Sequence, residues 1–138
     1  MRIMLLKKNY SHYKNELINI LNDLNKDNYL DGNNKTFILL NQNNKIIGWL
    51  DLRFVLDESE ILYLYILEEH RHNGLGEKIL SYSLDYLKKK HIKSVYLEVD
   101  NMNEYAIRLY KKIGFITVSI REKYYSNSHD AYVMKKEL

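Results

Sequence analysis

The sequence contains no cysteine, no proline and only five glycines among its 138 residues. Without cysteine, the chain can form no disulfide, no thiolate nucleophile and no cysteine-ligated zinc site. No apolar stretch approaches the roughly 20 residues that a helix needs to cross a bilayer. The apolar run near the N-terminus is also too short for a signal peptide. These absences predict a soluble, cytoplasmic protein with no membrane partner.

The overall composition is that of an ordinary globular protein, with 46% hydrophobic and 28% charged residues. A length of 138 residues fits a single domain that spans residues 1–138. The formal net charge of +3 is too small to indicate a nucleic-acid partner. The basic run at residues 88–90 lies where a helix is expected to end, and cations there complement the helix dipole. We therefore expect no nucleic acid.

Apolar periodicity predicts an alternation of strands and helices. Strands are expected at residues 1–6, 36–40, 46–54, 61–67, 94–99, 115–120 and 131–135, and helices at residues 10–24, 75–87 and 103–113. Turn-forming residues at 41–44 and 57–59 separate consecutive strands, which predicts an antiparallel meander. This order of elements predicts an α/β (α+β) fold in which helices pack on a mixed, mostly antiparallel sheet.

The segment between the third strand of the meander and the next helix has the features of an anion-binding loop. Its residues are Arg71, His72, Asn73, Gly74, Leu75 and Gly76. The first turn of a helix leaves backbone N–H groups unpaired and carries partial positive charge, so a pyrophosphate can satisfy both. Gly74 and Gly76 lack the Cβ atoms that would block its approach, and Arg71 could add a contact to a phosphate oxygen.

Taken alone, the same residues also fit a glycine-containing turn with a surface arginine. The loop lacks the Gly-Lys-Ser/Thr ending of a Walker A loop and is shorter than the dinucleotide-binding fingerprint. His70 and His72 flank Arg71 without a third ligand in register, so we expect no metal. The remaining motifs of the chain decide between these interpretations.

A strand followed by Arg-x-x-Gly-x-Gly and an amphipathic helix resembles the acetyl-CoA-binding core of the GNAT superfamily. Further motifs stand downstream at the spacing usual for that family: 97–99 (Leu-Glu-Val), 103–110 (Asn-x-x-Ala-Ile-x-Leu-Tyr) and 114–115 (Gly-Phe). Residues 121–125 and 130–134 look like those of its ribosomal-protein alanine N-acetyltransferases, the RimI subfamily. The resemblance covers residues 61–134 and implies a GNAT-like fold, acetyl-CoA as co-substrate and an amine acceptor.

Glu98 is the candidate general base. Strand alternation places it opposite Leu97 and Val99 and on the same face as Tyr96. An α-amine, with an ordinary pKa of about 8, is easier to deprotonate near neutrality than a lysine amine at about 10.4. A carboxylate that relays the proton through water would suffice. On a strand face such a glutamate is often only solvated, and the resemblance is what favours the base.

Tyr110 is the candidate general acid. It falls on the apolar stripe of its helix, so the ring can lie in the core while the hydroxyl reaches a cleft. Phenols have an ordinary pKa of about 10 and thiols of about 8.5, which allows a phenol to protonate a leaving thiolate. A tyrosine on such a stripe is more commonly a core aromatic without a catalytic role. The resemblance is what implies that Tyr110 acts as the general acid.

Two further features are expected to hold the co-substrate. Asn103 can cap its helix, and the resemblance implies that it also contacts the pantetheine arm. The backbone of Leu64, Tyr65 and Ile66 is expected to pair with the same arm, as a strand does in β-augmentation. By analogy, the N–H near Ile66 would stabilise the oxyanion, a contact worth roughly 2.7–4 kcal/mol.

The acceptor and the oligomeric state stay open. Asp100 replaces the arginine usual in the subfamily, and the loop at residues 126–130 is shorter than usual. Both changes lie near the expected acceptor site, where Tyr124 and Tyr125 could form a wall. The leading hypothesis is acetylation of a protein N-terminal α-amine, for example that of a ribosomal protein. A polyamine or amino sugar as acceptor, and a CoA-binding module without turnover, are the alternatives.

Overall fold

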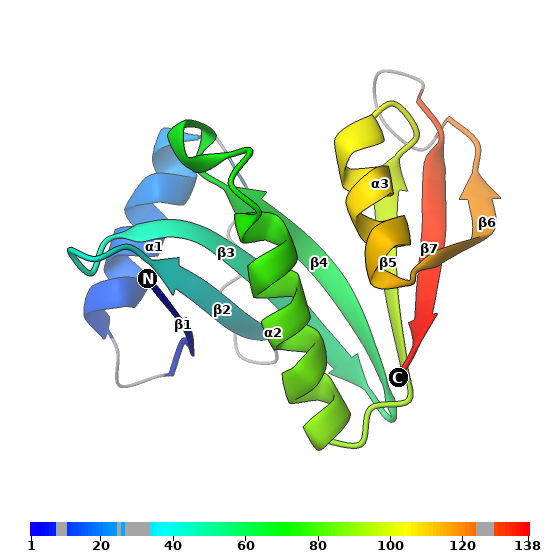
Figure 1. Ribbon diagram of the computed structural model, residues 1–138, viewed down its shortest axis with the longest axis horizontal. Helices are drawn as coiled ribbons and strands as arrows, with labels where there is room; N and C mark the ends of the chain where they lie inside the picture. The colour runs from blue at the N-terminus through cyan, green and yellow to red at the C-terminus, as the bar shows by residue number, and fades with distance from the viewer. Residues whose placement is uncertain (8–10, 25, 27–33, 124–128) are drawn as a thin grey trace.

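The computed structural model describes residues 1–7, 11–24, 26, 34–123 and 129–138. The elements in chain order are β1 (Arg2–Leu5), α1 (Ser11–Asp23), β2 (Asn34–Leu40), β3 (Ile46–Val55), β4 (Glu58–Ile66), the 3-10 turn η1 (Glu68–His70), α2 (Leu75–Lys89), β5 (Ser94–Asp100), α3 (Glu104–Ile113), β6 (Ile116–Arg121) and β7 (Ala131–Glu137) (Figure 1). The predicted order of strands and helices is confirmed.

The described strands form one sheet in the order β1-β2-β3-β4-β5-β7-β6. Neighbouring strands run antiparallel except β4 and β5, which are parallel. α2 provides the long crossover that a parallel pair requires. The prediction of a mixed, mostly antiparallel sheet with an antiparallel meander is therefore correct.

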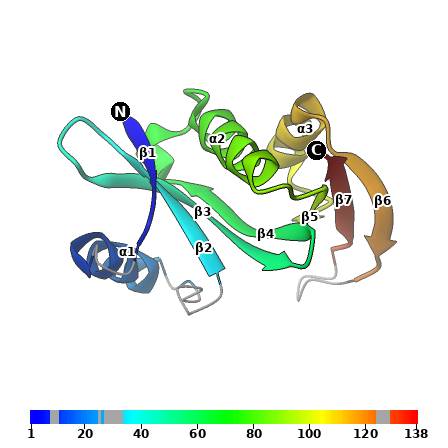
Figure 2. The same cartoon turned by 90° about the horizontal axis from the view of Figure 1, so that it is seen from below.

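The helices lie on both faces of the sheet. α1 covers one face, and α2 and α3 cover the other (Figure 2). Leu17 and Leu21 of α1 pack on one cluster with Trp49 of β3. The larger cluster lies under α2 and α3, and its helical members include Ile79, Leu80, Leu84, Leu87, Ile107 and Tyr110. Each helix thus buries the apolar stripe that the sequence periodicity indicates.

The side chains of β5 differ between the two faces of the sheet. Val95, Leu97 and Val99 are buried in the cluster under α2 and α3. Because side chains alternate along a strand, Glu98 and the other intervening residues point to the face that carries α1. The predicted two-faced strand is confirmed, and it sets Glu98 on the face opposite α2.

Several predicted boundaries were wrong by a few residues. β4 begins at Glu58, so the preceding turn lies at Leu56 and Asp57 instead of residues 57–59. β6 runs from Ile116 to Arg121 instead of residues 115–120. Turn-forming composition identifies a turn but does not fix its register, which depends on pairing with the neighbouring strand. The start of the first predicted helix and the residues Tyr124 and Tyr125 lie outside the described residues.

Within the described part of the chain, no helix is long and apolar enough to cross a bilayer. The same residues contain no group of three or more His, Cys, Asp or Glu side chains that could hold a metal ion.

Candidate acetyl-transfer site

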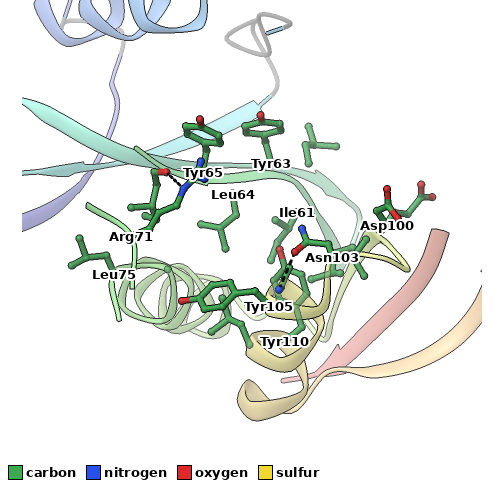
Figure 3. A pocket seen from close by; sticks show the side chains of 18 of the residues that line it. Ile61, Tyr63, Leu64, Tyr65, Arg71, Leu75, Asp100, Asn103, Tyr105 and Tyr110 are labelled. Atoms are coloured by element: carbon green, nitrogen blue, oxygen red, sulfur yellow. Dashed lines mark hydrogen bonds between the residues drawn. The ribbon is translucent and has the colours of Figure 1, made fainter. Parts of the chain in front are cut away.

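The central feature of the molecule is a slot where β4 and β5 separate. Their pairing extends from Glu58 beside Ser94 to Ile61 beside Leu97, although β4 continues to Ile66. The slot has a volume of about 790 Å³ and is lined by β4, β5, the loop before α2, and α3 (Figure 3). Along the edge of β4 that faces the slot, the backbone of residues 62–66 is not paired with β5.

A bulge in β4 explains why the two strands separate. Opposite β3, Asp51 pairs with Tyr63 and the next residue pairs with Ile61, so Leu62 is an extra residue in β4. A bulge bends its strand and increases the local twist. The bend therefore lies where β4 leaves β5, and it supports the prediction that residues 64–66 offer backbone groups to a bound molecule.

The loop before α2 borders one end of the slot. Gly74 caps α2 with a φ of 75°, and the structure gives the helix no side-chain cap at this end. A Cβ added at Gly74 would meet no atom within 4 Å, so the space in front of the first turn is open. The unpaired N–H groups of that turn can therefore reach an anion. His72, Leu75 and Gly76 line the slot, whereas Asn73 and Gly74 stand beside it.

Arg71 has a structural task that the sequence had not indicated. Its Nε donates to the carbonyl oxygen of Ile66 at 2.8 Å, and its guanidinium lies 4.9 Å from the ring centroid of Tyr65. Asn73 also donates its amide to the carbonyl oxygens of His70 and Arg71, at 3.3 and 3.2 Å. These contacts tie the loop before α2 to the end of β4. A phosphate contact by Arg71 stays a prediction.

The two candidate catalytic side chains line the same slot. Glu98 is half-buried on β5, and its Oε1 lies 3.0 Å from Nη1 of Arg121 on β6. Tyr110 is 8% exposed on α3, and its ring meets Phe115 edge to face at 5.8 Å between centroids. The structure therefore brings the predicted base and acid to one cavity, while the roles themselves stay predictions.

Asn103 caps α3, as predicted, because its Oδ1 accepts from the N–H of Ala106 at 3.2 Å. It also lines the slot, so the cap fixes the side chain at the wall of the cavity (Figure 3). The cap is confirmed, and a contact with the pantetheine arm remains a prediction.

Sequence reasoning missed the contact between Asp100 and His129. Nδ1 of His129, which precedes β7, lies 3.0 Å from Oδ2 of Asp100. Oδ1 of Asp100 accepts from the N–H of Met102 at 2.9 Å. The pair joins residues 29 positions apart in the chain, so no local sequence signal could have found it. Asp100 lines the slot, and His129 is not among the residues that line it.

A second hollow of about 290 Å³ lies on the sheet face that carries α1. It shares Glu60, Leu97 and Glu98 with the slot, and Arg121 and Val133 form part of its wall. Glu98 thus stands between the two spaces.

The slot combines an open helix end, an unpaired β4 edge, a carboxylate and a phenol, a combination that suits a group-transfer reaction. The chain matches the Acetyltransferase (GNAT) family over residues 5–115. It therefore belongs to that family, which confirms the predicted class of enzyme and fold.

Several named proteins and solved structures are similar to this chain. The chain is 33% identical over 98 residues to the ribosomal protein bS18-alanine N-acetyltransferase of Escherichia coli K12, covering 69% of this chain and 66% of that protein. The Haemophilus influenzae protein of the same name is 40% identical over 84 residues, covering 61% and 57%. The matched segments thus span somewhat less than two thirds of these relatives. The crystal structure of the Escherichia coli enzyme has a TM-score of 0.78 at 25% identity, covering 99% of this chain and 92% of that one.

A GNAT-family acetyltransferase from Streptococcus pneumoniae has a TM-score of 0.81 at 22% identity, which supports the fold. The crystal structure of NAA60 of Arabidopsis thaliana in complex with acetyl-CoA has a TM-score of 0.80 at 20% identity. These structures agree with the predicted arrangement of helices on a mixed sheet.

Proposed function

We propose that the protein transfers the acetyl group of acetyl-CoA to the N-terminal α-amine of a protein. The observation that carries the proposal is the slot between β4 and β5, with an open helix end at its border and Glu98 and Tyr110 in its lining. The identity to ribosomal-protein alanine N-acetyltransferases supports the choice of acceptor.

The residues of the slot fit acetyl-CoA in two respects. The first turn of α2, opened by Gly74, can bind the pyrophosphate through its N–H groups. The unpaired edge of β4 at residues 64–66 can pair with the amide groups of the pantetheine arm. Acetyl-CoA supplies the acetyl group as a thioester and is consumed as co-substrate.

In the proposed reaction, acetyl-CoA and the amine approach from opposite faces of the sheet. The open end of α2 and the cap of α3 lie on one face, whereas Glu98 points to the other. An amine that arrives through the second hollow therefore meets Glu98 before it meets the acetyl group. The hollow is open to solvent, so it also suits the end of a peptide chain.

Residues of this chain would then carry out the proton transfers of the reaction. Glu98, held in place by Arg121, takes a proton from the ammonium through water, and the neutral nitrogen forms the C–N bond. As the C–S bond breaks, Tyr110 gives its hydroxyl proton to the leaving sulfur, and the second proton that the nitrogen loses on becoming an amide returns through water to the Tyr110 oxygen. The N–H near Ile66 offers a donor to the carbonyl oxygen as negative charge develops on it.

The acceptor is tested by comparing kcat/KM for an alanine-starting peptide with kcat/KM for a panel of polyamines and amino sugars. We expect the peptide to be the better substrate by about tenfold or more, because its α-amine is easier to deprotonate than most alkylamines. A peptide with a blocked N-terminus serves as the control and should give no product. Faster turnover of the small amines would contradict the proposed acceptor.

A further inference from the structure

Three aromatic side chains form a platform on the sheet face that carries α1. The rings of Trp49 and Tyr65 lie 5.0 Å apart between centroids, and the ring of Tyr63 lies 6.1 Å from each of them. All three pack in the cluster that α1 covers. Figure 3 shows the rings of Tyr63 and Tyr65 on the opposite side of β4 from Leu64. This aromatic platform therefore lies on the face to which Glu98 points.

The ammonium group of Lys26 lies over the aromatic platform. Its Nζ is 4.9 Å from the ring centroid of Tyr65 and 5.2 Å from that of Tyr63. A cation within about 6 Å of an aromatic centroid is attracted by the negative face of the ring. The backbone of Lys26 is tied to α1, because its N–H donates to the carbonyl oxygen of Leu21 at 2.9 Å. No carboxylate among the residues that the structure describes forms an ion pair with Lys26. Within that part of the chain, the two rings hold the amine.

The aromatic platform borders the part of the slot where the acetyl group of the co-substrate is expected. Tyr63 and Tyr65 line the slot and belong to the stretch of β4 that is not paired with β5. In the proposed complex with acetyl-CoA, the pantetheine arm and the thioester lie along residues 64–66. Lys26 therefore places a primary amine close to the acetyl group, on the same face of the sheet as Glu98.

Two properties of Lys26 favour its reaction with a thioester in the slot. A lysine amine stands on a flexible four-carbon stem, so rotation about the side-chain bonds can carry Nζ from the rings toward the edge of β4. An amine of the same molecule also meets the thioester at a far higher effective concentration than an amine in solution. This advantage offsets the greater difficulty of deprotonating a lysine amine compared with an α-amine.

We propose that the protein acetylates its own Lys26, in cis, when acetyl-CoA is bound in the slot. This modification site goes beyond the proposed function, since it requires acetyl transfer in the slot but no peptide acceptor. The ammonium of Lys26 loses one proton to solvent, and the neutral nitrogen forms the C–N bond with the acetyl carbon. The C–S bond breaks, and the second proton that the nitrogen loses ends on the sulfur of CoA. The products are acetyl-lysine, the CoA thiol and one released proton.

The modification ends after one turnover. Acetylation removes the positive charge of a lysine and with it the attraction to aromatic rings. The acetylated side chain of Lys26 is therefore released from the aromatic platform, and the self-reaction adds one acetyl group to each chain.

The test incubates the wild-type protein with acetyl-CoA alone and maps acetyl-lysine by mass spectrometry over time. Lys93 is the internal reference for spontaneous acetylation, because its side chain is 76% exposed and it precedes β5 at the end where β4 and β5 are paired. We expect Lys26 to react about tenfold faster than Lys93 or more. Similar rates at the two lysines would overturn the inference.

Two further measurements separate transfer in the slot from other routes. A large excess of CoA, which occupies the slot without an acetyl group, should suppress acetylation of Lys26 and leave that of Lys93 unchanged. The fraction of Lys26 acetylated at a given time should not depend on protein concentration if the reaction occurs in cis. Acetylation of Lys26 that persists in excess CoA, or whose rate rises in proportion to protein concentration, would contradict the proposal.

Lys26→Arg keeps a cation for the rings but cannot form acetyl-lysine, so it should lose the fast acetyl incorporation. Lys93→Arg is the matched control, because arginine can still pair with Asp57, and it should react at Lys26 like the wild-type protein. Fast incorporation that survives in Lys26→Arg would overturn the assignment to this residue.

A parallel incubation with an alanine-starting peptide distinguishes failure of this inference from failure of the proposed function. If the peptide is acetylated and Lys26 is not, only the self-acetylation is wrong. If Lys26 is acetylated and the peptide is not, the self-acetylation stands and the proposed acceptor is wrong. If neither is acetylated, both proposals fail.

Discussion

Replacing Tyr110 with phenylalanine is expected to lower kcat by about 100-fold while changing CoA affinity by less than about threefold. The ring of Tyr110 is buried against Phe115, and phenylalanine keeps that packing. Only the hydroxyl is lost, and with it the proton for the leaving thiolate. Steady-state kinetics would give kcat, and calorimetric titration would give the dissociation constant of CoA.

The matched control for this change is Tyr82→Phe. Tyr82 lies on α2, is 46% exposed and does not line the slot, so both constants should stay at their wild-type values. If Tyr110→Phe retained full kcat, Tyr110 would be a core aromatic without an acid role. If the variant instead lost CoA affinity and kcat together, the hydroxyl would serve binding more than chemistry.

Asp51→Asn is expected to stabilise the protein near neutral pH. Asp51 is 1% exposed in the middle of β3, and its Oδ1 accepts from the hydroxyl of Thr36 at 2.5 Å. Burial raises the pKa of Asp51 from 3.8 to about 6, although the hydrogen bond from Thr36 acts in the opposite direction. The ionised carboxylate is therefore costly to keep inside the sheet.

The sign of the pH dependence follows from the raised pKa. Between pH 3.8 and about 6 the folded protein holds a proton on Asp51 that the unfolded chain has released. Stability is therefore lost as pH rises through this window and stays low above it. The difference between the two pKa values corresponds to about 3 kcal/mol at neutral pH, which is an upper bound for the gain in Asp51→Asn.

Chemical denaturation at pH 7 and pH 4.5 would measure this effect. The free energy of unfolding of Asp51→Asn should exceed that of wild type by about 1–3 kcal/mol at pH 7, and the gap should shrink at pH 4.5. Thr36→Val is the companion variant, which should be less stable than wild type at pH 7 because the carboxylate loses its donor. A gap that does not change with pH would show that Asp51 is not the titrating group.

Local periodicity was sufficient to predict most of the fold. The apolar stripes of α1, α2 and α3 and the alternation along β5 depend only on residues a few positions apart. The glycines before α2 and the asparagine before α3 likewise indicate the backbone conformation and hydrogen bonding at the start of a helix. These features predicted the element order and the cap at Asn103, which the structure confirms, and an anion-binding loop before α2, which stays a prediction.

The features that sequence could not give depend on contacts between distant segments. The bulge at Leu62 exists only in relation to β3, and it is what separates β4 from β5. The pair Glu98–Arg121 joins β5 to β6, and the pair Asp100–His129 joins β5 to the segment before β7. The periodicity of a strand does not indicate which residue elsewhere in the chain forms an ion pair with one of its side chains. The surroundings of Glu98 and Asp100 were accordingly less predictable than the loop before α2.

The measurement that tests the account most directly is mass-spectrometric mapping of the acetyl group on one peptide. The peptide would start with alanine and carry a single internal lysine, and it would be incubated with the protein and acetyl-CoA. The account predicts one acetyl group on the α-amine and none on the lysine. Acetylation of the lysine, or no transfer to the peptide at all, would contradict the central claim that the slot delivers acetyl groups to protein N-termini.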